Sequence, residues 1–211
     1  MSEDRTNRRP PSRGGGPRPL PGPKEIATKP LPIRSWSAPT YRICKVHRDP
    51  VYYGKNATYR FDAPGQEYGV MYVAETPEGA FVEACIRERP RGNLFSLSYF
   101  EERKLTEISF PSSLSLVDLT GPGLSLLGVD NRLTSGSYRV AQRWSRAFWS
   151  HPDHPDGILY CSRFNPSLRA IALFDRAGSG LPPRDCGPLA DPRNLRFLGE
   201  MLDRYLLALQ S

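Results

Sequence analysis

The stretch that most constrains this chain is residues 70–88, VMYVAETPEGAFVEACIRE, because it has the pattern of a strand that runs directly into a helix. Thr76 offers a hydroxyl N-cap, and Pro77 has the backbone angle that suits a first helical position. Since Pro90 disfavours helix at the residue before it, the sequence predicts a helix from Pro77 to about Arg89.

Glu83 is the exception in this predicted helix, whose neighbouring positions are small or apolar. Helical side chains lean over the residues three and four positions earlier, which here are Ala80 and Gly79. Because both are very small, the carboxylate is expected to point into a hollow near the strand-to-helix junction. The alternative is an i,i+4 ion pair with Arg87 on a solvated face, worth roughly a few tenths of a kcal/mol.

The rest of the chain mixes strands and helices without regular βαβ alternation. Apolar or alternating runs predict strands at 41–46, 68–74, 94–100, 105–110, 114–119, 156–163 and 170–174. Helical spacing of apolar residues predicts a helix over 137–150 and a last helix that opens at Asp191-Pro192. The sequence therefore predicts a single compact α+β domain.

The N-terminal part has a different composition. Residues 1–24 hold six Pro, four Gly and five Arg, and Leu20 is their only large apolar residue besides Met1. Such a segment buries too little surface to offset its ordering entropy, so residues 1–38 are predicted to be a disordered basic tail and residues 39–211 the folded domain. About four of the seven net positive charges lie in residues 1–24. It could touch nucleic acid or an acidic partner, or be a solvated linker.

Several classes of protein fit the sequence poorly. No apolar run approaches the roughly 18 residues that span a bilayer, and no signal peptide is recognisable, so a cytoplasmic location is expected. The four scattered cysteines favour buried thiols over disulfides. His151 and His154 have metal-like spacing, but each precedes a proline and no third ligand supports them, so no metal site is predicted. The Gly-rich stretches lack the flanking residues of a phosphate loop or a dinucleotide fold.

Four further side chains could carry chemistry. Arg42 and Arg60 lie in apolar or aromatic company, where a guanidinium suits bidentate phosphate binding, although each could be an edge-strand or surface residue. Tyr72 could stack on a ring or be an ordinary core tyrosine. Ser162 ends a buried run, where a hydroxyl often only forms a turn, and no G-x-S-x-G motif supports a hydrolase.

Together these residues resemble the RES domain family, named for its Arg, Glu and Ser. The matching features are, in order, Arg42 in an early strand, Arg60 ahead of FDAPG, Tyr72 and Glu83 in YGVMYVAETPEGAFVEA, Ser162 in DGILYCSR, and the apolar AIALF. The resemblance covers roughly residues 40–176. The chain departs from it at Ile43, where many members have an aromatic or polar residue, and in its long Arg/Pro tail.

The resemblance implies a central mixed sheet similar to that of ADP-ribosyltransferase toxins. RES proteins are toxins of bacterial toxin–antitoxin pairs that consume NAD⁺ as a substrate, with no cofactor. Described members split the nicotinamide glycosidic bond with inorganic phosphate, and others are reported to transfer ADP-ribose to a protein. Their usual partner is an antitoxin with a helix-turn-helix region, which blocks the active site.

The resemblance also implies residue roles, with Glu83, Arg42 and Ser162 expected to be catalytic. Loss of nicotinamide leaves an oxocarbenium-like ribose, whose charge Glu83 would oppose. Arg42 and Arg60 would hold the pyrophosphate or the incoming phosphate. Tyr72 would pack on the nicotinamide or ribose, and Ser162 would orient the nicotinamide end.

The expected function is therefore that of an NAD⁺ phosphorylase. One alternative is an ADP-ribosyltransferase that modifies a protein target. An alternative of another class is a basic nucleic-acid-binding module. Residues 25–211 carry only about +3 net charge and no RNA-binding motif, which argues against direct nucleic-acid binding.

Overall fold

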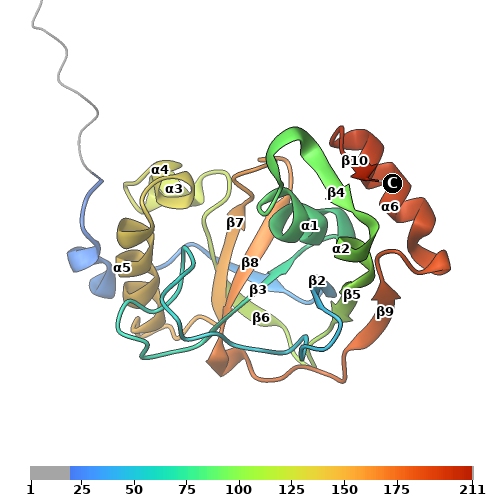
Figure 1. Ribbon diagram of the computed structural model, residues 1–211. Coiled ribbons are helices and arrows are strands. Elements are labelled where there is room, and N and C mark those ends of the chain that lie inside the picture. The colour runs from blue at the N-terminus through green and yellow to red at the C-terminus, as the bar shows by residue number, and fades with distance from the viewer. Residues whose placement is uncertain (1–19, 211) are drawn as a thin grey trace, which may run out of the picture.

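The computed structural model describes residues 20–210 (Figure 1). Over these residues one sheet has eight strands in the order β1-β6-β7-β8-β3-β2-β5-β9. Only the β6–β7 pair in this described sheet is parallel, so the sheet is mixed. The strands are β1 (Ile33–Trp36), β2 (Thr40–Lys45), β3 (Val70–Ala74), β5 (Arg103–Ile108), β6 (Leu114–Asp118), β7 (Gly157–Cys161), β8 (Arg169–Phe174) and β9 (Arg184–Pro188). The predicted α+β class is confirmed.

The other elements surround this sheet. A small parallel sheet joins β4 (Leu94–Ser96) to β10 (Ala208–Gln210). The helices are α1 (Pro77–Phe81), a π-helical turn (Val82–Ile86), α2 (Leu97–Glu101), α3 (Gly123–Leu126), α4 (Arg132–Ser135), α5 (Tyr138–Trp149) and α6 (Leu195–Arg204). Short 3₁₀ turns lie at Pro23–Thr28, Arg91–Asn93, Asp175–Ala177 and Pro192–Asn194. Within the described residues, no helix is long and apolar enough to cross a membrane.

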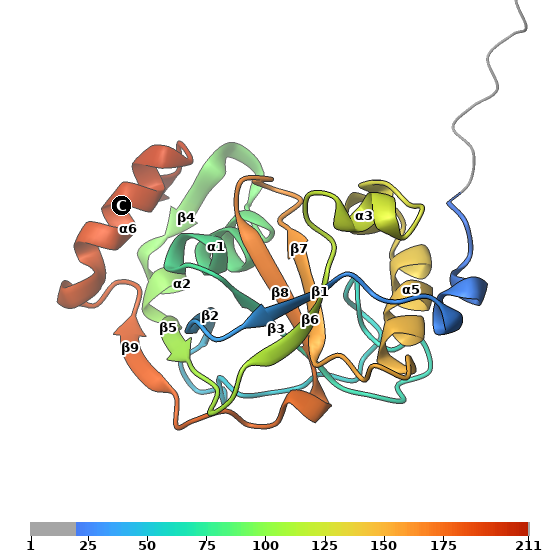
Figure 2. The same cartoon turned by 180° about the vertical axis from the view of Figure 1, so that it is seen from behind.

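Two groups of helices pack against one face of the sheet. Successive side chains of a strand point to opposite faces, so Val70, Tyr72 and Ala74 of β3 share one face. Near Val70, a core cluster forms with Trp144 and Phe148 of α5. Near Ala74, a second cluster holds the buried side chains of α1, the π-helical turn and α6. Figures 1 and 2 show α5 and α6 at opposite ends of the molecule with β7 and β8 between them. Tyr72 therefore lies between the two helical groups.

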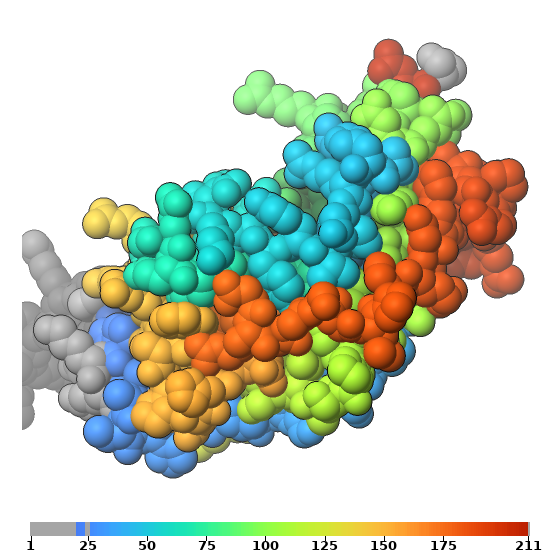
Figure 3. Space-filling model, turned by 90° about the horizontal axis from the view of Figure 1, so that it is seen from below, coloured from blue at the N-terminus to red at the C-terminus, as the bar shows by residue number. Residues whose placement is uncertain are grey.

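Irregular segments cover further parts of the sheet. The Tyr53 hydroxyl donates to the Gly178 carbonyl (2.6 Å), and Lys55 lies 3.5 Å from the Asp175 carboxylate. Figure 3 shows the corresponding segments, in cyan and orange, side by side on the underside of the molecule. The long connection from β2 to β3 is thereby fixed at one end against the chain that follows β8.

The predicted boundary between tail and domain at residue 38 is wrong. β1 is an edge strand that pairs antiparallel with β6, and Ile26, Leu31 and Trp36 are buried. The ordered part of this segment could not be recognised in the sequence, because its apolar residues occur singly among prolines and contact residues far along the chain. Residues 1–19, which were also predicted to be disordered, lie outside the described residues.

Two side chains near or within α5 hold this N-terminal segment. Trp144 donates its indole N–H to the Pro21 carbonyl at 3.3 Å. His151, which is buried, places Nε2 3.1 Å from the carbonyl oxygens of both Ile26 and Lys29. The histidine that showed metal-like spacing in the sequence thus has a structural role here.

The predicted strand at 94–100 is half right. The first three residues form β4, but Leu97–Glu101 is helical. Ser96 starts this helix, because its hydroxyl accepts a hydrogen bond from the Tyr99 amide (3.3 Å). The pattern of apolar residues in this stretch is compatible with a strand or a helix, and the Ser96 cap favours the helix.

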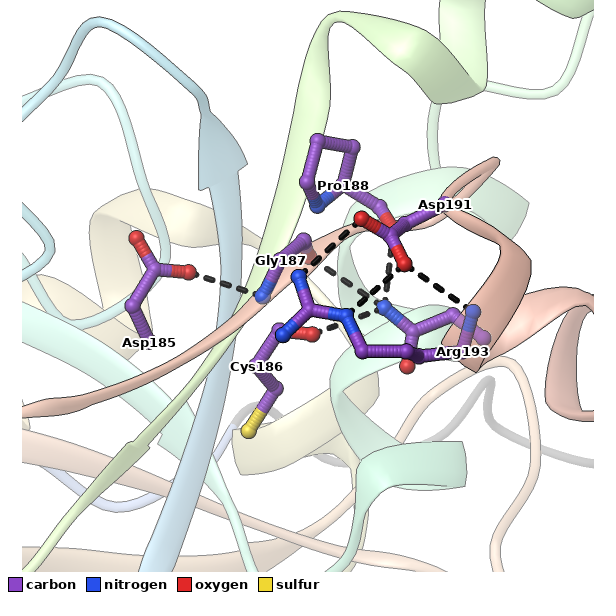
Figure 4. A network of polar contacts seen from close by, with 7 residues as sticks. Asp185, Cys186, Gly187, Pro188, Asp191 and Arg193 are labelled. Carbon is purple, nitrogen blue, oxygen red and sulfur yellow. Dashed lines mark hydrogen bonds and ion pairs between the residues drawn. The ribbon is translucent and has the colours of Figure 1, made fainter.

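A polar network joins the edge strand β9 to α6 (Figure 4). Gly187 has a φ of +87° and donates its amide to Asp185 at 2.8 Å. Asn194 donates its side-chain amide to the last three carbonyls of β9. Asp191 accepts from both the backbone amide (2.9 Å) and Nε (2.8 Å) of Arg193. This confirms the predicted helix start at Asp191-Pro192, which opens as a 3₁₀ turn.

Candidate active site

The helix that carries Glu83 begins as predicted and packs closely on β3. The Thr76 hydroxyl accepts a hydrogen bond from the Gly79 amide at 3.1 Å. A Cβ added at Gly79 would lie 3.0 Å from Cβ of Ala74, so glycine allows the helix to approach the strand. Ala80 lines a hollow beside Glu83, as the sequence predicted, whereas Gly79 packs against β3 and does not line that hollow.

The second half of this helix is not α-helical. The pattern predicted to reach about Arg89 ends at Phe81, and Val82–Ile86 forms a π-helical turn closed by the Arg87 amide on the Val82 carbonyl (3.2 Å). The wider turn keeps its apolar side chains in the core while Glu83 faces the hollow. Single π-helical turns are frequent at functional sites.

Ser162 lies close to Glu83. It is only 2% exposed, follows β7, and its hydroxyl is near enough to the Glu83 carboxylate to lower the pKa of that group. The same oxygen accepts from the Phe164 amide at 3.3 Å. Because the hydroxyl accepts from an amide, its own hydrogen is available for the carboxylate. The chain that follows β7 therefore brings a hydroxyl close to Glu83 from a distant part of the sequence.

The Glu83 carboxylate is partly desolvated. Burial raises its pKa above the ordinary value, while the Ser162 hydrogen bond and the positive charges of Arg87 and Arg60 oppose that rise. The i,i+4 ion pair with Arg87 does not form. Within residues 20–210, Arg87 instead lies 3.6 Å from Glu88 and over the Tyr59 ring at 4.8 Å.

Arg42 projects from β2 into the same region. Its Nη1 donates to the carbonyls of Pro50 (2.7 Å) and Tyr52 (3.2 Å). Burial lowers its pKa, and no carboxylate of the described residues forms an ion pair with it. The guanidinium is thus held by neutral groups, which leaves its charge available to an anionic ligand.

Arg60 is held in a similar way in the long connection between β2 and β3. It is 7% exposed, donates Nη1 to the Gly136 carbonyl (2.9 Å) and lies over the Tyr138 ring at 4.6 Å. Burial lowers its pKa as well.

Asp62 and Tyr72 fix the turn that carries Arg60. Asp62 accepts from the amides of Thr58 (2.9 Å) and Tyr59 (2.8 Å), and from the Tyr72 hydroxyl at 2.9 Å. The Tyr72 hydroxyl also accepts from the Phe61 amide at 2.8 Å. Since both hydrogen-bonding functions of this hydroxyl are used within the protein, only the Tyr72 ring is left to face a ligand.

The five side chains singled out in the sequence therefore gather at one place. Arg42, Tyr72 and Glu83 line a hollow of about 110 Å³, and Arg60, Tyr72 and Glu83 line a smaller one of about 30 Å³. Glu83 and Tyr72 line both hollows, and Ser162 lies close to Glu83. A carboxylate opposite several cations suits a ligand with a developing positive charge and anionic groups.

Other site residues were not predicted. Tyr59 and Arg87 line both hollows. Arg87 was considered only as an ion-pair partner of Glu83, although its position four residues later placed it near the same face. Tyr138 and Tyr160 line the smaller hollow and had no recognisable signal in the sequence. The described residues contain no group of three or more His, Cys, Asp or Glu side chains that could hold a metal ion.

Comparison with known proteins identifies the family. The model of the RES domain matches residues 39–191, which include all five of these residues. The chain belongs to the RES domain family. This RES domain is 32% identical over 127 residues to the probable toxin y4kH of Sinorhizobium fredii, a match that covers 58% of this chain and 98% of that protein.

A solved structure supports the same fold. The RES domain chain is similar to a chain in the crystal structure of the M. tuberculosis MbcT–MbcA toxin–antitoxin complex, with a TM-score of 0.58 and 20% sequence identity. The similarity covers 77% of this chain and 92% of that one. At this identity the match concerns the fold.

Proposed function

We propose that this RES domain is an NAD⁺-degrading toxin that splits the nicotinamide–ribose bond, with inorganic phosphate as the acceptor. The observation that carries the proposal is the Glu83 carboxylate, which lines both hollows, is partly desolvated, lies close to the Ser162 hydroxyl and is free of an ion pair in the described structure. Arg42 and Arg60, in the two hollows that meet there, supply charge for the anionic groups of a dinucleotide.

The reaction follows from these positions. As the bond from C1 of the ribose to the pyridinium nitrogen breaks, its electron pair leaves with neutral nicotinamide, and positive charge develops on the ribose. The Glu83 carboxylate stabilises that charge and binds ribose hydroxyls. A phosphate oxygen, positioned by an arginine, then forms the new bond to C1 and gives ADP-ribose phosphate. The Tyr72 ring packs on the ligand, and Ser162 keeps Glu83 oriented.

The toxin assignment rests on the family and its relatives. One relative is named a probable toxin, and the similar structure comes from a toxin–antitoxin complex. We propose accordingly that this protein acts in the cytoplasm and that an antitoxin with a helix-turn-helix region is its partner.

The proposal is tested by incubating the purified full-length protein with NAD⁺ in phosphate buffer and in phosphate-free buffer. We expect nicotinamide release that depends on phosphate, together with a product of the mass of ADP-ribose phosphate. ADP-ribose alone would assign water as the acceptor, and a protein that gains the mass of ADP-ribose would assign a transferase. Absence of nicotinamide release under all conditions, by a folded protein, would overturn the function.

A further inference from the structure

The hollow of about 110 Å³ beside Glu83 is called the Glu83 pocket here. It adjoins a larger hollow of about 500 Å³, called the second hollow, which is distinct from the small one of about 30 Å³. The two share one wall, formed by Arg42, Ile43, Tyr59, Ala84 and Arg87. The remaining lining comes from the end of β2, the segment that follows it, Glu88 just after the π-helical turn, and the start of β5. A ligand that fills the Glu83 pocket can therefore continue into this second hollow.

Cations dominate the second hollow. Its charged lining residues are the cations Arg42, Lys45, Arg48, Arg87 and Arg103 and the carboxylates Asp49 and Glu88. Glu88 is shared between Arg103 (3.1 Å) and Arg87 (3.6 Å). Lys45 and Arg48 form no ion pair within residues 20–210. The hollow thus has positive charge that the protein does not neutralise.

The sheet register places two of these cations opposite each other. Lys45 of β2 pairs directly with Arg103 of β5, so both side chains project from the same face. Like charges at directly opposite positions destabilise a sheet. Arg103 is partly compensated, because it lies over the Tyr99 ring at 3.4 Å and contacts Glu88. An anion bound between the strands and the following turn would offset the remaining repulsion.

Two tyrosines give the hollow aromatic surface. Tyr52 is 57% exposed and Tyr59 is 41% exposed, although both are large rings. The Tyr59 ring is held by Arg87 and by an edge contact with Tyr72 (5.7 Å between ring centroids). Exposed tyrosine rings beside cations are suited to a base stacked next to its phosphates.

We propose that this second hollow is a binding site for an adenosine diphosphate group, and that free adenine nucleotides occupy it in competition with the dinucleotide. Lys45 and Arg48 hold the phosphates, Arg87 stands where the two hollows join, and an exposed tyrosine contacts the base. The inference rests on the proposed function for its link to NAD⁺, because a dinucleotide with its nicotinamide ribose at Glu83 extends its other half here.

The probe is ADP, titrated calorimetrically into the full-length protein in phosphate-free buffer at low salt. We expect ADP to bind, to bind at least tenfold more tightly than pyrophosphate, and to inhibit NAD⁺ turnover competitively. The double variant Lys45→Ala/Arg48→Ala should weaken ADP binding at least tenfold and raise the KM for NAD⁺ more than it lowers kcat. The matched control, Arg143→Ala/Arg196→Ala, removes two exposed cations that line neither hollow and should bind ADP as the parent does.

Equal ADP affinity in the double variant and the control would overturn the site, as would absence of ADP binding to the parent. Pyrophosphate that binds as tightly as ADP would overturn the contact with the adenosine. Failure of the proposed function gives a different result, since ADP would then still bind through Lys45 and Arg48 while NAD⁺ remained intact. Normal NAD⁺ turnover without competition by ADP would reject only the nucleotide site.

Discussion

The substitution Glu83→Gln separates the catalytic role of this side chain from a structural one. The amide keeps the size of the side chain, and its carbonyl oxygen can still accept a hydrogen bond from the nearby Ser162 hydroxyl. It removes the charge that would oppose a positive ribose in the transition state. Loss of one preorganised electrostatic partner typically costs on the order of 10²–10³ in rate, about 3–4 kcal/mol. We therefore expect kcat for NAD⁺ consumption to fall at least a hundredfold.

The same substitution should not destabilise the fold at neutral pH. Burial raises the pKa of Glu83 in the folded state above its ordinary value of 4.5, so the protonated form favours folding at low pH. That contribution is lost as pH rises through the folded-state pKa, and at neutral pH the buried charge carries a net cost. Because glutamine has no such charge, the thermal midpoint at pH 7 should equal or slightly exceed that of the parent.

Steady-state nicotinamide release and thermal unfolding measure the two effects in the same preparations. Glu200→Gln is the matched control, since it removes an exposed carboxylate on α6 outside the site. The activity of the parent should also decrease as pH falls through the raised pKa of Glu83, and the residual rate of Glu83→Gln should lack that decrease. A folded Glu83→Gln variant with near-parental turnover would refute the reasoning.

Three further perturbations have defined outcomes. Arg42→Lys should raise KM for NAD⁺ or phosphate with little change in thermal midpoint. A lysine ammonium cannot donate to the carbonyls of Pro50 and Tyr52 and also form a bidentate contact with an anion. Unchanged KM values for both ligands would assign Arg42 a structural role. Tyr72→Phe leaves an Asp62 oxygen and the Phe61 amide without their hydrogen-bond partner. The free energy of unfolding, measured with urea, should therefore fall by about 1–3 kcal/mol. A decrease smaller than the error of that measurement would contradict the described network. Deletion of residues 1–19 should leave the thermal midpoint and turnover nearly unchanged. Deletion of residues 1–38 removes β1 and should prevent stable folding. Equal stability of the two truncated proteins would reject the role assigned to β1.

Local signals in the sequence predicted the starts of elements well. Thr76 and Asp191 each precede a proline, and each caps its helical turn with a side-chain oxygen as expected. Such signals depend on a few adjacent residues, so they can be recognised in the sequence without knowledge of the tertiary structure.

Features set by distant contacts could not be predicted. β1 is a short strand among prolines, and it becomes recognisable only through its pairing with β6, where Arg34 bonds to Asp118 at 2.8 Å. The π-helical turn at Val82–Ile86 keeps the amino-acid pattern of an α-helix, because the change lies in which carbonyl each amide reaches. Val82, Cys85 and Ile86 of this turn are buried, and these contacts with distant parts of the chain are not visible in the local sequence.

For the candidate site, residue types indicated the members but not their connections. Glu83 was recognisable as a carboxylate in apolar surroundings, and Ser162 lay far from it in the sequence. Asp62 had no signal of its own, yet it accepts three hydrogen bonds that position the turn of Arg60. Which hydroxyl or carboxylate supports a site residue depends on the folded arrangement of segments that sequence patterns describe separately.

The most direct test of the central claim is a crystal structure of the Glu83→Gln variant with intact NAD⁺. The account predicts the nicotinamide ribose in the hollow between Arg42, Tyr72 and residue 83, with its hydroxyls at the substituted side chain and the diphosphate toward Arg87. A dinucleotide bound elsewhere, or one whose reactive ribose carbon lies far from residue 83, would contradict it.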